Sequence, residues 1–150
     1  NPILDAEGRY AGALTMIIDI SDRKRMEETL RQLATHDALT GLFNRRYFFT
    51  LAERELERSQ RYGHPLALLM LDLDHFKAIN DSRGHQAGDQ VLRAVASIIQ
   101  TNLRQIDVVG RYGGEEFVVL LPETARMTAL AVAKRLCAAV AVQSVELSGE

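Results

Sequence analysis

Three apolar runs constrain the fold of this 150-residue chain more than any other feature. Residues 66–73, LALLMLDL, form a continuous apolar stretch that is typical of a strand buried on both faces. The runs DVVGRY and FVVLL, at 107–112 and 117–121, predict two further strands, and Pro122 closes the second of them. Segments with helical spacing lie between and around these runs. Strands that alternate with helices indicate an α/β or α+β sandwich.

Three segments of the chain after residue 43 carry the helical pattern. The first runs from Asn44 to Tyr62, and Gly63 supplies its stop. The second is expected over 89–103, after the glycine-containing polar loop NDSRGHQAG. Thr124 can cap a last helix that extends through Val142.

The first 36 residues have a different character. Residues 5–8 carry a turn signal, and a β-rich stretch follows from Tyr10 to Ile20, which predicts the end of an upstream sheet because one or two strands do not fold alone. Ser21 and Asp22 can cap a charged helix over the next residues. This helix carries one apolar stripe, formed by Met26, Leu30 and Leu33. It is either a surface helix that packs on its own domain or a linker helix that dimerises.

Composition excludes several classes of protein. The net charge of −2 gives no general reason to bind nucleic acid or an anionic membrane surface. No run approaches the roughly twenty apolar residues that span a bilayer, so we expect a cytoplasmic chain with no membrane contact, although an anchor could lie upstream. The single cysteine, Cys137, lies in an apolar stretch, which predicts a buried and inert thiol in a reducing compartment.

Acidic pairs follow the predicted strands. Asp72 and Asp74 are two residues apart and project to one face if the strand continues through them. Glu115 and Glu116 lie in RYGGEEF, residues 111–117, where the two glycines allow the positive φ angles of a tight hairpin turn. If the two strand ends are neighbours in the sheet, three or four carboxylates converge there.

Converging carboxylates repel one another unless a cation compensates them. Hard oxygen ligands favour Mg²⁺ or Mn²⁺, and Mg²⁺ usually binds together with substrate phosphates. Taken alone, each acidic pair is better explained as a pair of solvated turn residues. Because both pairs terminate apolar strands, we favour a metal site.

Several other polar residues lie near these acids. Lys77 can place a positive charge beside a phosphate, or it is an ordinary surface lysine. Three residues surround the loop of Gly84 and Gly88, and could read a guanine edge or form turns and caps: Asn80, His85 and Asp89. Arg104 and Asp107, three residues apart, are consistent with a local salt bridge.

Three blocks of the sequence together resemble the GGDEF family of diguanylate cyclases. They are HDALTGLFNRRYF at 36–48, LDLDHFKAINDSRGHQAGDQVL at 71–92 and RYGGEEF at 111–117, and the resemblance extends from about residue 36 to 142. The stretch EGRYAGALTMIIDISDRKRMEE resembles the end of a PAS sensory domain that passes into a signalling helix. The resemblance implies PAS-like strands over 1–20, a linker helix over 21–36, and a GGDEF domain over 37–150 that lacks its C-terminal part.

The resemblance also implies an activity. Family members condense two GTP molecules into cyclic di-GMP and release two pyrophosphates, and one domain holds one GTP, so a homodimer is expected. The implied fold is a mostly antiparallel sheet flanked by helices, similar to the palm of nucleotide polymerases and to nucleotide cyclases. The alternative is a catalytically inactive GGDEF domain that acts as a receptor for GTP or cyclic di-GMP or as a dimerisation module.

By the matched motifs, the resemblance implies a role for each candidate residue. Mg²⁺ (or Mn²⁺) is held by Asp72, the carbonyl of Leu73 and Glu115, with Glu116 close by; Glu115 and Glu116 are the catalytic pair. The remaining roles are guanosine binding by Asn80, His85 and Asp89, phosphate contact by Phe76 and Lys77, nucleotide contact at Gly113 and Gly114, and product inhibition at Arg104 and Asp107. The sequence departs from the family pattern in having glutamate at position 115 where aspartate is usual, and the family continues past this chain's end with another strand pair and basic residues that contact phosphates.

Overall fold

The computed structural model describes residues 2–4, 6–13 and 19–142, and it divides into two compact units, Asn1–Arg31 and Gln32–Glu150. The first unit holds the antiparallel hairpin of β1 (Pro2–Leu4) and β2 (Tyr10–Ala13), so the predicted turn between them is confirmed. The expected strand is shorter than predicted, because Asp19 and Ile20 belong to no strand. Its stretch 14–18 lies outside the described residues.

Helix α1 (Ser21–Thr35) follows the hairpin, as predicted. None of its side chains is buried, and its apolar stripe is exposed: Met26 by 68%, Leu30 by 62% and Leu33 by 66%. No helix in the described part of the chain combines the length and the apolar character that crossing a membrane requires.

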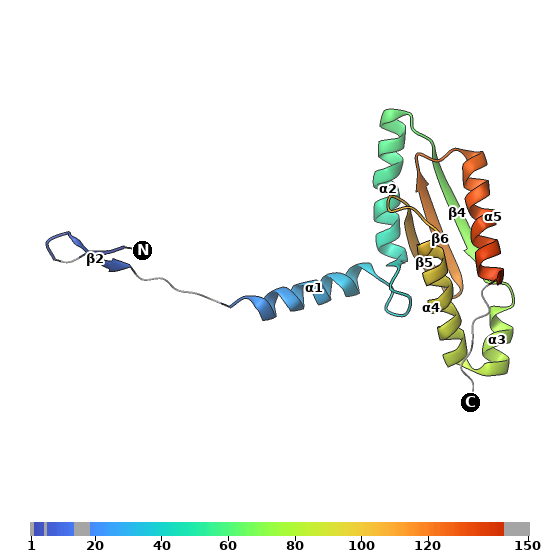
Figure 1. Ribbon diagram of the computed structural model, residues 1–150, viewed down its shortest axis with the longest axis horizontal. Helices are drawn as coiled ribbons and strands as arrows, with labels where there is room; N and C mark the ends of the chain where they lie inside the picture. Colours follow the sequence, from blue (N-terminus) through green and yellow to red (C-terminus); the bar gives the residue numbers. More distant parts are fainter. Residues whose placement is uncertain (1, 5, 14–18, 143–150) are drawn as a thin grey trace. The chain divides into compact units, whose positions relative to one another are not determined.

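The second unit is built on a four-stranded sheet in the order β3-β5-β6-β4 (Figure 1). Its strands are β3 (Phe43–Asn44), β4 (Leu66–Asp72), β5 (Val108–Gly113) and β6 (Glu116–Pro122). β6 pairs antiparallel with both β4 and β5, and only the short β3 runs parallel to β5. The sheet is therefore mostly antiparallel, as expected, and the two strands that end in acids are neighbours.

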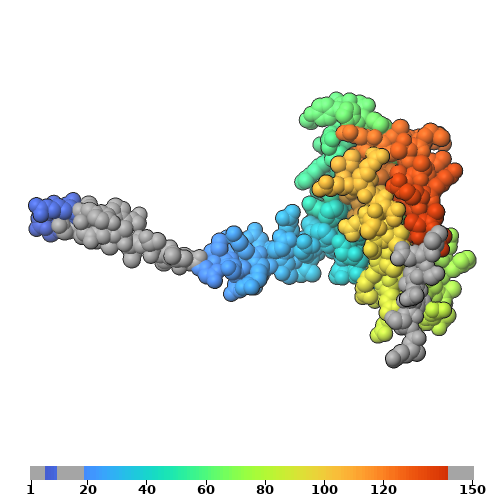
Figure 2. Space-filling view, in the orientation of Figure 1, coloured from blue at the N-terminus to red at the C-terminus, as the bar shows by residue number. Residues whose placement is uncertain are grey.

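Helices cover both faces of this sheet, so the α+β class is confirmed. α4 (His85–Thr101) and α5 (Arg126–Val142) lie side by side on one face (Figures 1 and 2), where they pack with β6 residues Phe117, Val119 and Leu121. α2 (Arg45–Tyr62) covers the other face, where Phe48 packs against Val118 and Leu120. The alternation of β6 side chains between two hydrophobic clusters is what a central strand requires.

β4 differs from its prediction because it is an edge strand. Leu69 and Leu71 pack against the cluster of α4 and α5, whereas Leu68 and Met70, on the opposite face, are 59% and 54% exposed. α2 lies mainly over β5 and leaves Leu68 and Met70 on this face of β4 exposed. The apolar run alone could not distinguish an edge strand from a central one.

Two helix predictions also need correction. The residues after β4 form an unexpected helix, α3 (Phe76–Arg83), and α4 begins at His85 rather than Asp89, so most of the predicted loop is helical. Gly84, with φ of 81°, separates the two helices. Thr124 does not cap α5, because its hydroxyl donates to the Pro122 carbonyl and the helix begins at Arg126.

Cys137 was expected to be buried but is exposed. Its neighbour Leu136 is fully buried and occupies the inward-facing side of α5 at this turn. Consecutive residues of a helix point about 100° apart, so an apolar stretch with small residues does not determine which side chain faces the core.

Candidate active site

The β5–β6 hairpin brings two of the predicted acids together. In the pairing of β4 with β6, Asp72 lies directly opposite Glu116. Directly opposite side chains share one face of a sheet, with Cβ atoms about 5 Å apart. Gly114 and Glu115 form the two-residue connection between β5 and β6, and Gly114 has the positive φ, 48°, that such a turn needs.

These carboxylates have no positive partner in the described part of the chain. Neither Asp72, which is exposed, nor the half-buried Glu115 and Glu116 forms an ion pair or a side-chain hydrogen bond there. Asp74 does not join them, because β4 ends at Asp72 and Asp74 lies in the following turn, contrary to the expected continuation of the strand. Among the described residues, no three acidic, histidine or cysteine side chains are grouped closely enough to hold a metal ion by themselves.

The donor set nevertheless fits a hard divalent cation. Asp72 and Glu115 are carboxylates without partners in the described part of the chain, and with the backbone carbonyl of Leu73 they offer oxygen ligands. The Leu73 carbonyl accepts a hydrogen bond from the Phe76 amide at 3.3 Å, which leaves its second lone pair available. Mg²⁺ commonly takes only one or two carboxylates and completes its shell with water and phosphate oxygens, so a group of three side chains is not required.

The N-terminus of α3 lies three residues beyond Leu73. His75 has a left-handed φ of 61° and turns the chain sharply from β4 into the helix. Phe76 is 92% buried in the core cluster, so only its backbone is available at this point, whereas Lys77 is exposed and has no ion pair in the described part of the chain. A helix N-terminus with a lysine in its first turn, next to unpaired acids, suits a metal-bound phosphate chain.

The elbow between α3 and α4 places the three candidate guanosine residues. Asn80 comes from the second turn of α3 and lies against Gly88 of α4, where an added Cβ would collide with the Asn80 side-chain oxygen. His85 and Asp89 are one turn apart on α4 and therefore share a face. The local signal for α3, apolar Phe76 and Ile79 at helical spacing, was present in the sequence but was masked by the polar residues around Gly84.

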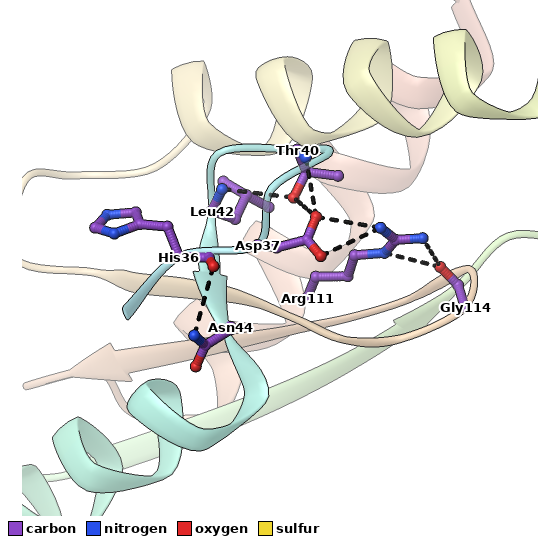
Figure 3. Close-up of polar contacts among 7 residues, drawn as sticks. All are labelled: His36, Asp37, Thr40, Leu42, Asn44, Arg111 and Gly114. Carbon is purple, nitrogen blue, oxygen red and sulfur yellow. Dashed lines mark hydrogen bonds and ion pairs between the residues drawn. The ribbon is translucent and has the colours of Figure 1, made fainter. Parts of the chain in front are cut away.

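The turn after α1, residues 36–44, holds the hairpin from one side (Figure 3). Arg111 donates through Nη1 to both carboxylate oxygens of Asp37, at 3.1 and 3.3 Å, and through Nε and Nη2 to the Gly114 carbonyl, at 3.0 and 2.8 Å. Asp37 Oδ1 also accepts from the amide and hydroxyl of Thr40. Sequence reasoning missed this contact.

The electrostatics of Asp37 follow from these contacts. Burial favours the neutral acid, but the hydrogen bonds from Thr40 and the charge of Arg111 outweigh it, so the pKa of Asp37 lies below its ordinary value of 3.8. The carboxylate is therefore ionised at neutral pH. It holds the Arg111 guanidinium in place to donate its hydrogen bonds to the Gly114 carbonyl.

Arg104 and Asp107 lie away from these acids, in the turn between α4 and β5. The Arg104 amide donates to Asp107 Oδ2 at 2.8 Å, while the Arg104 side chain is exposed and forms no ion pair with Asp107, contrary to the local salt bridge considered above. Asp107 Oδ1 is buried without a hydrogen-bond partner. The turn lines a cavity of about 320 Å³ together with Gln100, His36 and Phe43.

Comparisons with known proteins find a family model and several relatives that match most of the chain. The family model described as "Diguanylate cyclase, GGDEF domain" matches residues 34–150. Diguanylate cyclase DgcM of Escherichia coli K12 is 44% identical over 136 residues, which cover 91% of this chain and 33% of DgcM. The chain thus spans a third of the length of that curated relative.

Solved structures show the same architecture. Diguanylate cyclase SiaD of Pseudomonas aeruginosa, crystallised with its activator SiaC, superposes with a TM-score of 0.75 at 41% identity, over 87% of this chain and 52% of SiaD. The coiled coil and GGDEF domain of DgcB from Caulobacter crescentus, in complex with c-di-GMP, gives 0.73 at 35% identity, over 78% of this chain and 61% of that one.

Proposed function

The chain belongs to the GGDEF family of diguanylate cyclase domains, and on that premise we propose that the full-length protein condenses two GTP molecules into cyclic di-GMP. The observation that carries the proposal is the pairing of Asp72 with Glu116 beside the Glu115 turn, where carboxylates stand together without a positive partner in the described part of the chain. A receptor or a structural module has no need for such an arrangement, whereas phosphoryl transfer from a nucleotide does.

In this proposal Asp72, the Leu73 carbonyl and Glu115 hold Mg²⁺ or Mn²⁺. When bound there, the cation supplies charge that stabilises the leaving pyrophosphate. Glu115 receives the proton of the attacking 3′-hydroxyl, with Glu116 beside it. The backbone at the start of α3 and the Lys77 ammonium bind the phosphates and keep the α-phosphorus in line with the attack.

Guanine is bound at the elbow of α3 and α4. Asn80, His85 and Asp89 offer both donors and acceptors there, which a guanine edge requires. The open hairpin fits a nucleotide lying over it, because a Cβ at Gly113 or Gly114 would meet nothing within 4 Å. Within the described part of the chain, packing therefore does not explain why residue 113 is a glycine.

Each transfer joins the 3′-oxygen of one GTP to the α-phosphorus of the other and breaks the bond to pyrophosphate. Two such transfers close the ring and release two pyrophosphates. Because one chain has one such site, we propose that two protomers face each other, with the exposed stripe of α1 as the pairing element. Arg104 and Asp107, at the cavity beside the turn after α1, form the site where the product inhibits.

Glu115→Gln tests the activity. We expect it to lower cyclic di-GMP formation by roughly 10²–10⁴-fold, because it removes a charge that acts on the metal and the hydroxyl proton. The melting temperature should not fall, since Glu115 forms no ion pair in the described part of the chain and its charge is repelled by its neighbours. Product is measured by chromatography with GTP and Mg²⁺, on the full-length protein.

Glu57→Gln is the matched control. Glu57 is exposed on α2, far along the helix from the hairpin, so its loss should leave the rate unchanged. A wild-type protein that binds GTP with Mg²⁺ but forms no product would refute the cyclase proposal in favour of the receptor.

Arg104→Ala should abolish inhibition by added product without changing the initial rate.

A further inference from the structure

A β-bulge lies immediately before the turn that carries Glu115. In the pairing of β5 with β6, Arg111 is opposite Phe117, but the next pair is Gly113 with Glu116, so Tyr112 is an extra residue. An extra residue in a bulge is left out of the hydrogen-bond ladder and bends the strand. The direction in which the hairpin tip leaves the sheet is therefore set by side-chain contacts at this point more than by sheet hydrogen bonds.

Tyr112 makes its contacts with the start of α2. The Arg45 guanidinium carbon lies 4.3 Å from the centre of the Tyr112 ring, in cation–π geometry, and Phe49 packs edge-on against the same ring at 6.1 Å. Arg111, the preceding residue, is held by Asp37 instead. The two residues before the glycines are thus held by different contacts.

Asn44, the residue before Arg45, joins α2 to the last turn of α1. Its Nδ2 donates to the Ala34 carbonyl at 3.0 Å, and its Oδ1 accepts from the Tyr47 amide at 2.9 Å as the cap of α2. Arg45 therefore starts from a backbone position that is fixed to the end of α1. A series of contacts thus runs from the last turn of α1 through Asn44 and Arg45 to Tyr112 and the hairpin.

We propose that Arg45 and Tyr112 are positioning residues that set the direction of the Glu115 turn relative to Asp72. The inference rests on the proposed function, in which Glu115 acts on metal and substrate. Neither residue touches the reacting atoms. Their contact fixes the bulge, and the bulge fixes where the Glu115 carboxylate lies.

The test compares Arg45→Gln with Arg54→Gln, another exposed arginine of α2, which forms no ion pair in the described part of the chain. In the full-length protein, Arg45→Gln should lower kcat by roughly three- to thirtyfold and raise the Mg²⁺ concentration for half-maximal rate, because a displaced catalytic group costs rate steeply. The melting temperature should hold, since Arg45 is exposed. Arg54→Gln should behave as wild type in every measurement.

Variants of Tyr112 complete a double-mutant cycle with Arg45→Gln. Tyr112→Phe keeps the ring face and should keep the rate, whereas Tyr112→Leu keeps the apolar contact but removes the ring and should resemble Arg45→Gln. If the two residues act as one unit, the double variant of Arg45→Gln and Tyr112→Leu should be no slower than the slower single variant. Additive losses, or a falling melting temperature with unchanged kcat, would show packing alone and overturn the proposal.

A readout without turnover separates this inference from the cyclase proposal. With ¹⁵N-glycine labelling, the amide signals of Gly113 and Gly114 can be assigned through their alanine variants among the ten glycines of the chain. Arg45→Gln should shift both signals in the nucleotide-free chain, and Arg54→Gln should shift neither. If the full-length protein forms no cyclic di-GMP, the cyclase proposal fails, while unshifted glycine signals in Arg45→Gln refute the positioning role whatever the activity.

Discussion

At the scale of single residues, Asp37 joins the turn after α1 to the hairpin. Its carboxylate is 24% exposed and pairs with Arg111, which is 16% exposed, so solvent screens the pair only in part. Because the folded pKa of Asp37 is below the ordinary value of 3.8, its ionised form stabilises the fold above that pH, and the contribution is lost as the pH falls through the lower folded pKa.

Asp37→Asn should therefore lower the free energy of unfolding at pH 7 by about 1–3 kcal/mol, the range for a removed partner of a charged hydrogen-bonded group. The difference from wild type should shrink as the pH falls below 3.8 and through the lower folded pKa, because the acid then becomes protonated in the folded as well as the unfolded state. Urea titrations at several pH values measure it. Asp22→Asn is the control, since the Asp22 side chain is 97% exposed beside Arg25 and should show no difference. A pH-independent loss at Asp37 would contradict the electrostatic explanation.

Gly88 illustrates a residue whose constraint is steric. Gly88→Ala should push the Asn80 side chain away and weaken binding of a non-hydrolysable GTP analogue about tenfold, which corresponds to roughly 1.4 kcal/mol. The fold should persist, because alanine favours a helix by up to about 1 kcal/mol over glycine. Calorimetric titration measures the affinity. If Gly88 acts only through Asn80, the double variant with Asn80→Ala binds no more weakly than Asn80→Ala alone; additive losses would refute the steric link.

At this scale the sequence predicted that the acids lie together, but it did not predict the Asp37–Arg111 ion pair that holds the hairpin beside them. Asp72 and Glu116 could be placed together because each stands at the end of an apolar run. Asp37 and Arg111 are 74 positions apart, and neither lies in a local pattern that signals the other. Asp74 was placed with the acids because no residue pattern signals that the strand stops at Asp72 and that His75, with a positive φ, turns the chain into α3.

At the scale of elements, side-chain contacts link the β5–β6 hairpin to residues 36–44 and to the start of α2. β4, β5, β6, α2 and α5 were predictable because each has an apolar run or apolar residues at helical spacing, whereas the two-residue β3 was not predicted. α3 was not predicted, because this helix has only eight residues, most of its side chains are polar, and glycine follows it. The exposed face of β4 was not predictable either, since an apolar run does not reveal how far α2 extends across the sheet.

Asn44→Asp tests the connection between α1 and α2. Aspartate caps a helix about as well as asparagine, so α2 should keep its stability. The variant removes the amide that donates to the Ala34 carbonyl and replaces it with a negative charge, so the last turn of α1 should fray. Hydrogen exchange at residues 33–36 should accelerate several-fold, while exchange within α2 stays unchanged. Equal acceleration in both helices would show that the cap itself was lost.

At the scale of the whole molecule, the site is half of what the proposed reaction requires. One protomer offers one hairpin, one α3–α4 elbow and one α1, and two bound GTP molecules must meet. The α1 stripe of Met26, Leu30 and Leu33 is exposed by more than 60% at each position, and its polar face is charged. Apolar residues four and three positions apart form the seam of a two-helix coil. This pattern left a surface helix and a dimerising linker helix equally open, and the resemblance to the GGDEF family implied the linker.

Leu30→Glu should weaken pairing, because it places like charges opposite each other in the seam of two identical helices. The specific activity of the variant should fall steeply on dilution and recover at high protein concentration, since each protomer still folds: α1 has no buried residue. Sedimentation velocity reports the dimer, and cyclic di-GMP formation at matched concentrations reports the activity. Glu27→Gln, on the polar face, should leave both unchanged. Full activity of Leu30→Glu at concentrations where it sediments as a monomer would show that the two GTP molecules meet without pairing through α1.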